Sequence, residues 1–236
     1  MNDIITGKVN SFQSLGTVDG PGIRFVVFLQ GCNLRCSCCH NPETWDISGG
    51  RAYTPLEIAQ KAERYKEYFG FEGGITLSGG EPLLQAEFAA EVFKICKEKG
   101  INTCLDTSGS VLNNSVKKLL SYTDTVLLDI KYTNDADYKN YVGCDFSKPV
   151  EFLEYLKENN IPTVIRQVII PTVNDNEENI KKLADIVKKH PNIIKTELLP
   201  FKKLCQAKYD NLDIPFPFKY IPTPNHEDME KLKALL

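Results

Sequence analysis

Four cysteines fall within eight positions directly after an apolar run, and no other feature of the sequence constrains the fold as strongly. The cluster reads Cys32-Asn-Leu-Arg-Cys36-Ser-Cys38-Cys39, and residues 25–31 before it read Phe-Val-Val-Phe-Leu-Gln-Gly. A short apolar run that ends in glycine predicts a buried strand. We therefore expect the cysteines at the carboxyl end of a strand, where α/β folds place their active sites.

The spacing of three of these cysteines predicts an iron–sulfur site. Cys32, Cys36 and Cys39 follow the pattern Cys-x3-Cys-x2-Cys, so one short loop offers three thiolates to one metal centre. A fully ligated [4Fe–4S] cluster uses four cysteines, so three ligands would leave one iron open to another ligand. Cys38 could replace Cys39 in a Cys-x3-Cys-x-Cys pattern, but the spacing favours Cys39.

A structural zinc site and a disulfide framework are the other interpretations of these cysteines. Zinc sites usually take paired ligands from two separated segments, whereas the next cysteines here are the isolated Cys96 and Cys104. Disulfides are typical of secreted chains, and residues 1–6 carry no basic or apolar leader. The sequence contains no apolar run of about 18 residues, so no membrane span is predicted. We expect a cytoplasmic protein without a membrane partner.

Length and charge narrow the class further. The chain has 236 residues and a formal net charge of −3, with no long block of like charges. A single domain, residues 1–236, is expected at this length. The weakly acidic balance argues against nucleic acid as the main partner.

Apolar runs and amphipathic stretches alternate along the chain, which predicts a parallel sheet or barrel. The predicted strands are residues 24–30, 74–77, 102–106, 125–130, 162–169 and 194–199. The predicted helices are residues 55–69, 84–99, 113–121, 148–159, 176–189 and 226–235. Six strands are too few for a closed eight-stranded barrel. Residues 206–224 contain four prolines and are predicted to be irregular.

Helix ends are marked by local signals. Residues 54–57, Thr-Pro-Leu-Glu, form a capping box with proline at the first helical position. Gly100 is expected to end the second helix, and Asn225 to cap the last one.

Polar residues follow the predicted strands at their ends. Residues 78–82 read Ser-Gly-Gly-Glu-Pro, residues 106–109 read Asp-Thr-Ser-Gly, and residues 129–131 read Asp-Ile-Lys. Glycines let the backbone approach a ligand closely, and Glu81 adds a negative charge beside them. These ends are therefore candidates for binding a ligand.

Two positions place charge where an apolar core is expected. Asp129 and Lys131 cannot both point into such a core without partners, so one should face a cleft. Arg166 lies inside a run rich in Val and Ile and needs a partner there. That partner is a ligand carboxylate, a substrate backbone, or an acidic side chain in a structural ion pair.

Together these motifs resemble the radical S-adenosylmethionine (SAM) superfamily. Its signature is the Cys-x3-Cys-x2-Cys spacing, and its second motif is a Gly-Gly-Glu-Pro sequence like that at residues 79–82. The resemblance implies an α/β fold, a partial (β/α)6 barrel open on one side to admit a large substrate. It also implies that Cys32, Cys36 and Cys39 hold a [4Fe–4S] cluster whose fourth iron binds SAM.

Within the superfamily, the chain resembles the glycyl-radical enzyme activases that act on pyruvate formate-lyase. The similarity is carried by residues 16–24, 40–46 and 198–201, and it covers the chain from about residue 7 onward. Many other activases carry an inserted ferredoxin-like domain, whereas no cysteine lies between Trp45 and Thr54 here. This absence favours the pyruvate formate-lyase type.

The resemblance implies an activity. A reduced flavodoxin or ferredoxin supplies one electron, and SAM splits into methionine and a 5′-deoxyadenosyl radical. That radical removes a hydrogen atom from a glycine Cα of pyruvate formate-lyase. The implied protein acts as a monomer, without nucleic acid.

The resemblance also assigns roles to residues at the matching positions. The implied SAM contacts are Cys38, Cys39, His40, Gly79, Gly80, Glu81, Asp129, Ile130, Lys131, Arg166 and Lys202. The implied ligands of a monovalent cation are Asp106, Thr107 and Asp129, and Asp19 touches the incoming glycine loop. Lys202 stands where family members often carry a histidine near the adenine.

Three alternative functions remain open. The chain could activate a different glycyl-radical enzyme, or act on a small molecule in a barrel closed by lid segments. A non-enzymatic electron-transfer or zinc-binding protein would have no affinity for SAM. That last interpretation leaves the Gly-Gly-Glu-Pro and Asp-Ile-Lys strand ends unexplained.

Overall fold

The computed structural model describes residues 5–236 and divides into two compact units. The first unit contains residues 5–33 and Thr44–Leu127, and the second contains Leu34–Glu43 and Leu128–Leu236. The chain therefore passes from the first unit to the second and back within the cysteine-rich segment. The expectation of a single domain over residues 1–236 stays a prediction.

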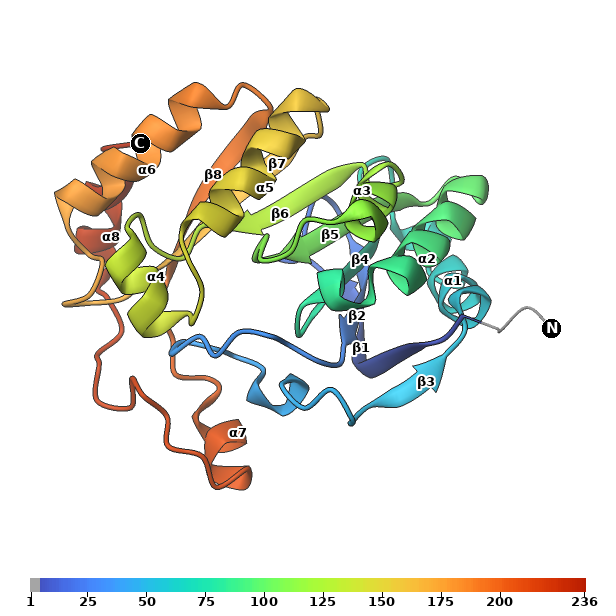
Figure 1. The fold of residues 1–236 in the computed structure, drawn as a ribbon, viewed down its shortest axis with the longest axis horizontal. Coiled ribbons are helices and arrows are strands. Elements are labelled where there is room, and N and C mark those ends of the chain that lie inside the picture. The colour runs from blue at the N-terminus through green and yellow to red at the C-terminus, as the bar shows by residue number, and fades with distance from the viewer. Residues whose placement is uncertain (1–4) are drawn as a thin grey trace. The chain divides into compact units, whose positions relative to one another are not determined.

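The strands form an open sheet in the order β3-β1-β2-β4-β5-β6-β7-β8 (Figure 1). They are β1 (Gly7–Gly16), β2 (Arg24–Leu29), β3 (Arg51–Tyr53), β4 (Gly74–Gly79), β5 (Asn102–Thr107), β6 (Thr125–Asp129), β7 (Thr163–Ile169) and β8 (Ile193–Pro200). β2, β4 and β5 pair in parallel, as do β7 and β8, whereas β1 runs antiparallel to β2 and β3. The predicted fold class, an α/β fold with an open parallel sheet, is confirmed.

All six predicted strands are present, as β2 and β4 to β8, with ends that differ from the prediction by at most two residues. β1 and β3 were not predicted. Polar residues interrupt β1 throughout, and β3 is only three residues long, so neither contains an apolar run.

Helices accompany the strands in both units. They are α1 (Pro55–Glu63), α2 (Ala86–Glu98), α3 (Asn114–Leu120), α4 (Asp135–Tyr141), α5 (Ser147–Glu158), α6 (Glu177–Lys189), α7 (Gln206–Asn211) and α8 (His226–Lys233). In the first unit α2 packs against both α1 and α3, and in the second α5 and α6 lie beside β7 and β8 (Figure 1).

Two helix predictions were too long and two helices were missed. α1 ends at Glu63 and is followed by a separate 3-10 turn, while Pro82–Gln85 form a 3-10 turn before α2 begins. α4 and α7 have only seven and six residues, which is too short for a clear helical period. α7 lies within the segment that was expected to be irregular.

The predicted capping signals at Thr54, Gly100 and Asn225 are confirmed. The Thr54 N–H donates to Glu57 Oε2 at 2.7 Å, and the Glu57 N–H donates to Thr54 Oγ1 at 3.3 Å, which completes the capping box. The Asp228 N–H donates to Asn225 Oδ1 at 2.8 Å. Gly100 follows α2 with a φ of 66°, a conformation that glycine adopts without strain.

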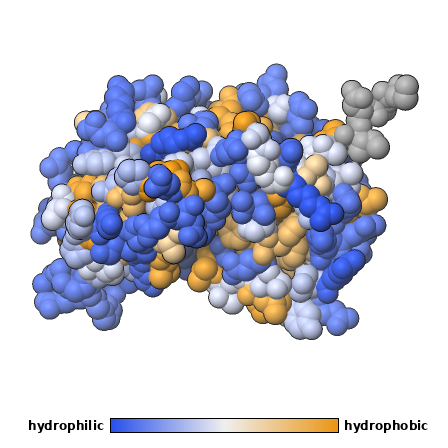
Figure 2. Space-filling view, turned by 90° about the horizontal axis from the view of Figure 1, so that it is seen from below, coloured by the Kyte–Doolittle hydropathy of each residue, from blue (hydrophilic) through white to orange (hydrophobic). Residues whose placement is uncertain are grey.

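Hydrophilic side chains cover most of the face drawn in Figure 2, with smaller apolar areas between them. The most exposed large apolar side chains are Phe71, Tyr220, Leu204 and Val18. Single exposed apolar residues are normal, so only neighbouring ones suggest a binding surface. Among the residues that the structure describes, no helix is both long enough and apolar enough to cross a bilayer.

One charged side chain, Arg24, is buried at the amino end of β2. Its guanidinium is 0% exposed and donates to the carbonyls of Glu72 (2.9 Å) and Ile75 (2.5 Å). It also donates to the side-chain oxygens of Thr76 (3.0 Å) and Asn102 (2.9 Å). The guanidinium therefore joins the beginnings of β2, β4 and β5.

Replacing Arg24 with methionine should lower the free energy of unfolding by about 3 kcal/mol or more, because several buried acceptors lose their donor. Arg51→Met is the matched control, since Arg51 is exposed and lies over the Tyr53 ring at 5.3 Å. That change should cost at most about 1 kcal/mol. Urea unfolding measures both, and equal losses would contradict the role given to Arg24.

Candidate functional site

The Gly79-Gly80-Glu81 sequence is joined to the end of β2, directly before Cys32. The Gly80 N–H donates to the Leu29 carbonyl at 2.9 Å, and the Glu81 N–H donates to the Gly31 carbonyl at 2.8 Å. A Cβ at Gly80 would lie 2.1 Å from the Gly31 oxygen. The two glycines are therefore required by this close approach of backbone to backbone, which fixes the chain just ahead of Cys32.

Glu81 has a structural role that the sequence analysis did not predict. Its side chain is 2% exposed, and its carboxylate accepts hydrogen bonds from the Thr107 hydroxyl, the Ser108 hydroxyl, the Ser108 N–H (3.0 Å) and the Leu83 N–H (3.2 Å). Burial raises the pKa of this carboxyl, against the effect of these donors. The expected negative charge beside a SAM ammonium is thus engaged within the chain.

Asp106 and Thr107 stand next to this carboxylate at the end of β5. The Ser78 hydroxyl donates to Asp106 Oδ2 at 2.7 Å, and the Gly109 N–H donates to Thr107 Oγ1 at 3.1 Å. The first unit therefore brings together the ends of β4 and β5, including two of the three predicted cation ligands.

Asp19, the predicted substrate contact, lies in the loop between β1 and β2 of the first unit. Its carbonyl accepts a hydrogen bond from the Thr76 hydroxyl at 2.7 Å, which ties the loop to β4. The neighbouring Val18 side chain is exposed. The role of Asp19 toward a substrate stays a prediction.

In the second unit, Asp129, Lys131 and Arg166 form one half-buried charge group. Arg166 Nε and Nη2 lie 3.1 Å and 3.0 Å from Asp129 Oδ1, and Lys131 Nζ lies 3.0 Å from Asp129 Oδ2. Burial alone would raise the pKa of Asp129, but Arg166 and Lys131 outweigh it and lower that pKa. The acidic partner considered for Arg166 is therefore Asp129. Asp129 thus holds both cationic side chains together in the second unit.

The side chain of Ile130 is buried, and its backbone N–H is already hydrogen-bonded within the chain. The side chain is 0% exposed, and the Ile130 N–H donates to the Arg166 carbonyl at 3.0 Å. The next N–H, of Lys131, donates to the Tyr138 hydroxyl at 3.0 Å. The Asp-Ile-Lys strand end is thus rigidly held.

The cysteine loop of the second unit packs against the end of α4. The Arg35 N–H donates to the Val142 carbonyl at 3.1 Å, and the Ser37 N–H donates to the Tyr141 carbonyl at 2.8 Å. The loop also adjoins the Asp-Ile-Lys strand end. Burial would lower the pKa of Lys131, but Asp129 and the thiols of Cys36 and Cys38 raise it well above its usual value.

The thiols of the loop are half-buried, and the described part of the chain contains no disulfide. Burial raises the pKa of Cys38 to about 11, so its thiol is neutral at pH 7. Among residues 5–236, no three His, Cys, Asp or Glu side chains are already arranged around a metal position.

The chain after β8 holds the far end of the cysteine loop. The ring nitrogen Nε2 of His40 lies 3.1 Å from the Lys202 carbonyl, and it carries the proton because a carbonyl only accepts. Lys208 Nζ lies 2.7 Å from Asn41 Oδ1 and 2.6 Å from Glu43 Oε1. Lys202, predicted near the adenine, is therefore brought beside His40 through its backbone.

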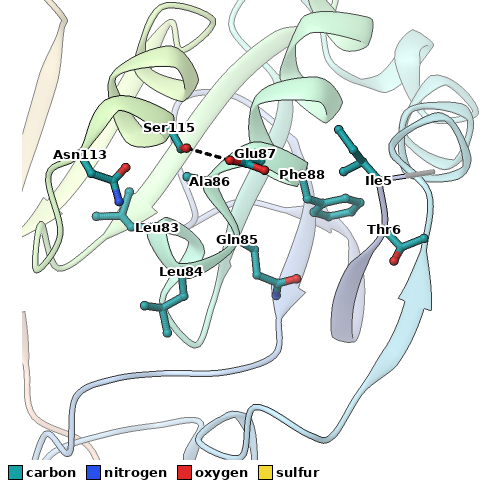
Figure 3. Close-up of a pocket in the computed structure, with 10 residues that line it drawn as sticks. All are labelled: Ile5, Thr6, Leu83, Leu84, Gln85, Ala86, Glu87, Phe88, Asn113 and Ser115. Atoms are coloured by element: carbon teal, nitrogen blue, oxygen red, sulfur yellow. Dashed lines mark hydrogen bonds between the residues drawn. The ribbon is translucent and has the colours of Figure 1, made fainter. Parts of the chain in front are cut away.

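A cavity of about 460 Å³ opens beside the start of α2 in the first unit (Figure 3). Figure 3 shows Glu87 and Ser115 on its wall, where the Ser115 hydroxyl donates to Glu87 Oε1 at 3.0 Å. None of the predicted site residues lines this cavity.

A protein-family model described as the radical SAM superfamily matches residues 26–184. The chain belongs to this superfamily. Members of the radical SAM superfamily use a [4Fe–4S] cluster and SAM, and the Cys-x3-Cys-x2-Cys loop lies within the matched residues.

Full-length relatives place the chain more narrowly. The pyruvate formate-lyase-activating enzyme of Clostridium pasteurianum is 44% identical over 234 residues, which are 99% of this chain and 98% of that protein. The pyruvate formate-lyase 1-activating enzyme of Escherichia coli K12 is 39% identical over 235 residues, covering 98% and 96%. A crystal structure of a domain of the Bacteroides vulgatus pyruvate-formate lyase-activating enzyme superposes with a TM-score of 0.58 at 25% identity, covering 70% of this chain and 92% of that one. This radical SAM chain is a member of the family of pyruvate formate-lyase-activating enzymes.

The residues present fit the radical SAM cofactors. Four half-buried thiols in one loop supply the soft ligands that an iron–sulfur cluster requires. The cationic groups of Lys131 and Arg166 belong to the same unit as Cys36 and Cys39, and such groups suit the carboxylate of SAM.

The sequence analysis missed two residues that shape this site. Ser108 gives two hydrogen bonds to Glu81, and its position after Asp106-Thr107 was the only available signal. Lys208 lies in the segment expected to be irregular, and no sequence pattern links it to Asn41 and Glu43, far earlier in the chain.

Glu81→Gln should lower the free energy of unfolding by roughly 1–3 kcal/mol. Each carboxylate oxygen accepts a fixed backbone N–H, from Leu83 or from Ser108, so an amide nitrogen in either place would face a donor. Glu91→Gln is the control, because Glu91 only pairs with Lys118 near the helix surface. Urea unfolding of the two variants should differ, and equal midpoints would contradict this account.

Lys208→Met should loosen the cysteine loop while costing about 1 kcal/mol or less of global stability, because the ion pair is partly exposed. We expect amide hydrogen exchange in residues 36–43 to accelerate severalfold, and Lys208→Arg to restore part of the protection. Lys195→Met removes a comparable pair with Glu197 and should leave these amides unchanged. Unaltered exchange in Lys208→Met would show that this contact does not hold the loop.

Proposed function

We propose that this protein activates pyruvate formate-lyase by removing a hydrogen atom from a glycine Cα of that enzyme. The proposal rests on the full-length similarity to pyruvate formate-lyase-activating enzymes, at 44% and 39% identity. When bound, the reduced cluster and SAM supply the 5′-deoxyadenosyl radical that takes this hydrogen atom. The protein contributes binding, orientation and exclusion of water.

Cys32, Cys36 and Cys39 are the proposed cluster ligands. They lie within eight consecutive positions, and the superfamily spacing selects Cys39 over Cys38 as the third. Residues 79–81 fix the chain ahead of Cys32, while the end of α4 and Lys208 fix the part that carries the other two.

SAM is proposed to bind through backbone groups and one charge contact. Lys131 and Arg166 would face its carboxylate, because both side chains are cationic and Asp129 holds them together. Gly79, Gly80 and Glu81 would meet its amino group through carbonyl oxygens, since the Glu81 carboxylate is already engaged. The other proposed contacts are Cys38, Cys39 and His40 near the adenine, Asp129 and Ile130 near the ribose or carboxylate, and Lys202 beside His40.

We also propose that a monovalent cation binds at Asp106, Thr107 and Asp129. Carboxylate and hydroxyl oxygens suit such an ion. Asp129, however, already has two cationic partners, so it would share its charge with them.

The proposed substrate is a glycine loop of pyruvate formate-lyase, contacted by Asp19. The electron donor is a flavodoxin or ferredoxin, and the activase works as a monomer built as one domain over residues 1–236. We propose a cytoplasmic location, because iron–sulfur ligation requires thiols and thiols persist in reducing compartments.

Electron paramagnetic resonance of the anaerobically reconstituted, reduced protein tests the proposal. We expect a [4Fe–4S]⁺ signal that changes when SAM is added, and a glycyl radical doublet when pyruvate formate-lyase is present. Cys39→Ser should abolish both, whereas the adjacent Cys38→Ser should retain both. A cluster signal indifferent to SAM would contradict the radical SAM assignment, and a SAM response without the doublet would point to a different substrate.

A further inference from the structure

The segment after β8 packs against the cysteine loop of the second unit. His40 Nε2 lies 3.1 Å from the Lys202 carbonyl, and Glu43 pairs with the Lys208 ammonium. Cys205, between these two lysines, is 1% exposed, whereas the neighbouring Leu204 is 79% exposed. The outside of this segment therefore begins at Lys202, which is bonded to the residue directly after Cys39, a proposed cluster ligand.

Exposed apolar and basic side chains gather on that outside. Lys203 Nζ donates to the Lys219 carbonyl at 3.2 Å, which brings residues 203–204 beside residues 219–220. The Tyr220 side chain is 89% exposed, and Lys219 Nζ lies 6.0 Å from its ring. We refer to Lys202, Lys203, Leu204, Lys219 and Tyr220 as the 203/219 surface.

The lysines of this surface differ from those on the helices of the same unit. Lys181, Lys182 and Lys231 each pair with a glutamate one helical turn away. In the described part of the chain, the ammonium groups of Lys202, Lys203 and Lys219 form no ion pair with a carboxylate. The 203/219 surface is therefore a local positive area on a chain whose formal net charge is −3.

A shallow groove continues this surface toward α8. It has a volume of about 280 Å³, is lined mostly by apolar atoms, and begins at Lys202. His226 and Lys233 lie on its rim, and Met229 and Pro224 line its wall. Apolar contact bordered by positive charge is the composition of a surface that receives an acidic protein.

We propose that the 203/219 surface is where an acidic one-electron carrier protein docks to reduce the cluster. This inference rests on the proposed function, and it names the part of the surface that the electron donor uses. One electron passes from the carrier to the [4Fe–4S]²⁺ cluster, giving [4Fe–4S]⁺ and a carrier oxidised by one electron, with no bond made or broken. Small electrostatically guided interfaces are typical of such short-lived complexes.

Charge complementarity favours an acidic carrier protein, rather than the glycine loop of pyruvate formate-lyase, as the occupant of the 203/219 surface. Uncompensated lysines accelerate encounter with an acidic protein and make the rate depend on salt. The bond between the Lys202 carbonyl and His40, the residue after Cys39, places the surface near a proposed cluster ligand, where an electron must enter.

The test measures binding and reduction by a reduced bacterial flavodoxin, using the reconstituted holoenzyme. We expect Lys203→Glu/Lys219→Glu to weaken the dissociation constant measured by calorimetry, and to slow reduction in stopped flow, each by about tenfold at low salt. Both differences should shrink as ionic strength rises. The Lys203 ammonium also donates to the Lys219 carbonyl, so its replacement by glutamate could disturb the local backbone. Lys203→Gln/Lys219→Gln is therefore a milder second variant, and we expect a smaller effect in the same direction.

Lys148→Glu/Lys188→Glu is the matched control, because it also changes the net charge from −3 to −7 and affects exposed lysines of the same unit. We expect it to bind and be reduced within about twofold of the unmodified protein. Equal weakening by the control, or unchanged binding of both surface variants, would overturn the proposal.

Dithionite separates this inference from the proposed function, because a small inorganic reductant needs no docking surface. The surface variants should form the glycyl radical normally with dithionite. If the unmodified protein forms no glycyl radical with dithionite, the proposed function fails, while the flavodoxin affinities still decide the docking surface.

Discussion

Glu81 connects the carboxyl ends of three neighbouring strands through its buried carboxylate and its backbone N–H. It follows β4, its N–H donates to the Gly31 carbonyl just after β2, and its carboxylate accepts four donors from residues 107–108 at the end of β5 and from Leu83 after β4. Burying a charge costs free energy unless it is fully hydrogen-bonded, and here the bonds fix the backbone where Cys32 begins. The Gly-Gly-Glu-Pro sequence therefore acts on the cluster loop through geometry.

The second unit is organised by charge in a similar way. Asp129 pairs with both Lys131 and Arg166 and holds them in place. Asp129 and the thiols of Cys36 and Cys38 raise the pKa of Lys131, which keeps its ammonium charged. Cationic donors of this kind suit a carboxylate, which agrees with the SAM expected from the family membership.

Much of the fold and of the cluster loop was predictable, because the sequence patterns that indicate them are local. The six core strands and the Thr54 cap follow from runs of adjacent residues, and the cysteine spacing identified the superfamily. The features that were predicted wrongly or missed depend on contacts between residues far apart in the sequence. The Glu81 carboxylate was expected to face a ligand, because nothing in the sequence reveals that Ser108 bonds to it. β1 and α7 lack a strong period of their own, and Lys208 meets Glu43 only after folding.

Deuterium transfer tests the central claim most directly. Pyruvate formate-lyase labelled with deuterium at glycine Cα would be activated by the reduced protein with SAM, and the 5′-deoxyadenosine analysed by mass spectrometry. We expect 5′-deoxyadenosine that carries one deuterium, in proportion to the glycyl radical formed. 5′-Deoxyadenosine without deuterium, formed alongside the radical, would contradict direct abstraction from glycine and with it the function assigned to this chain.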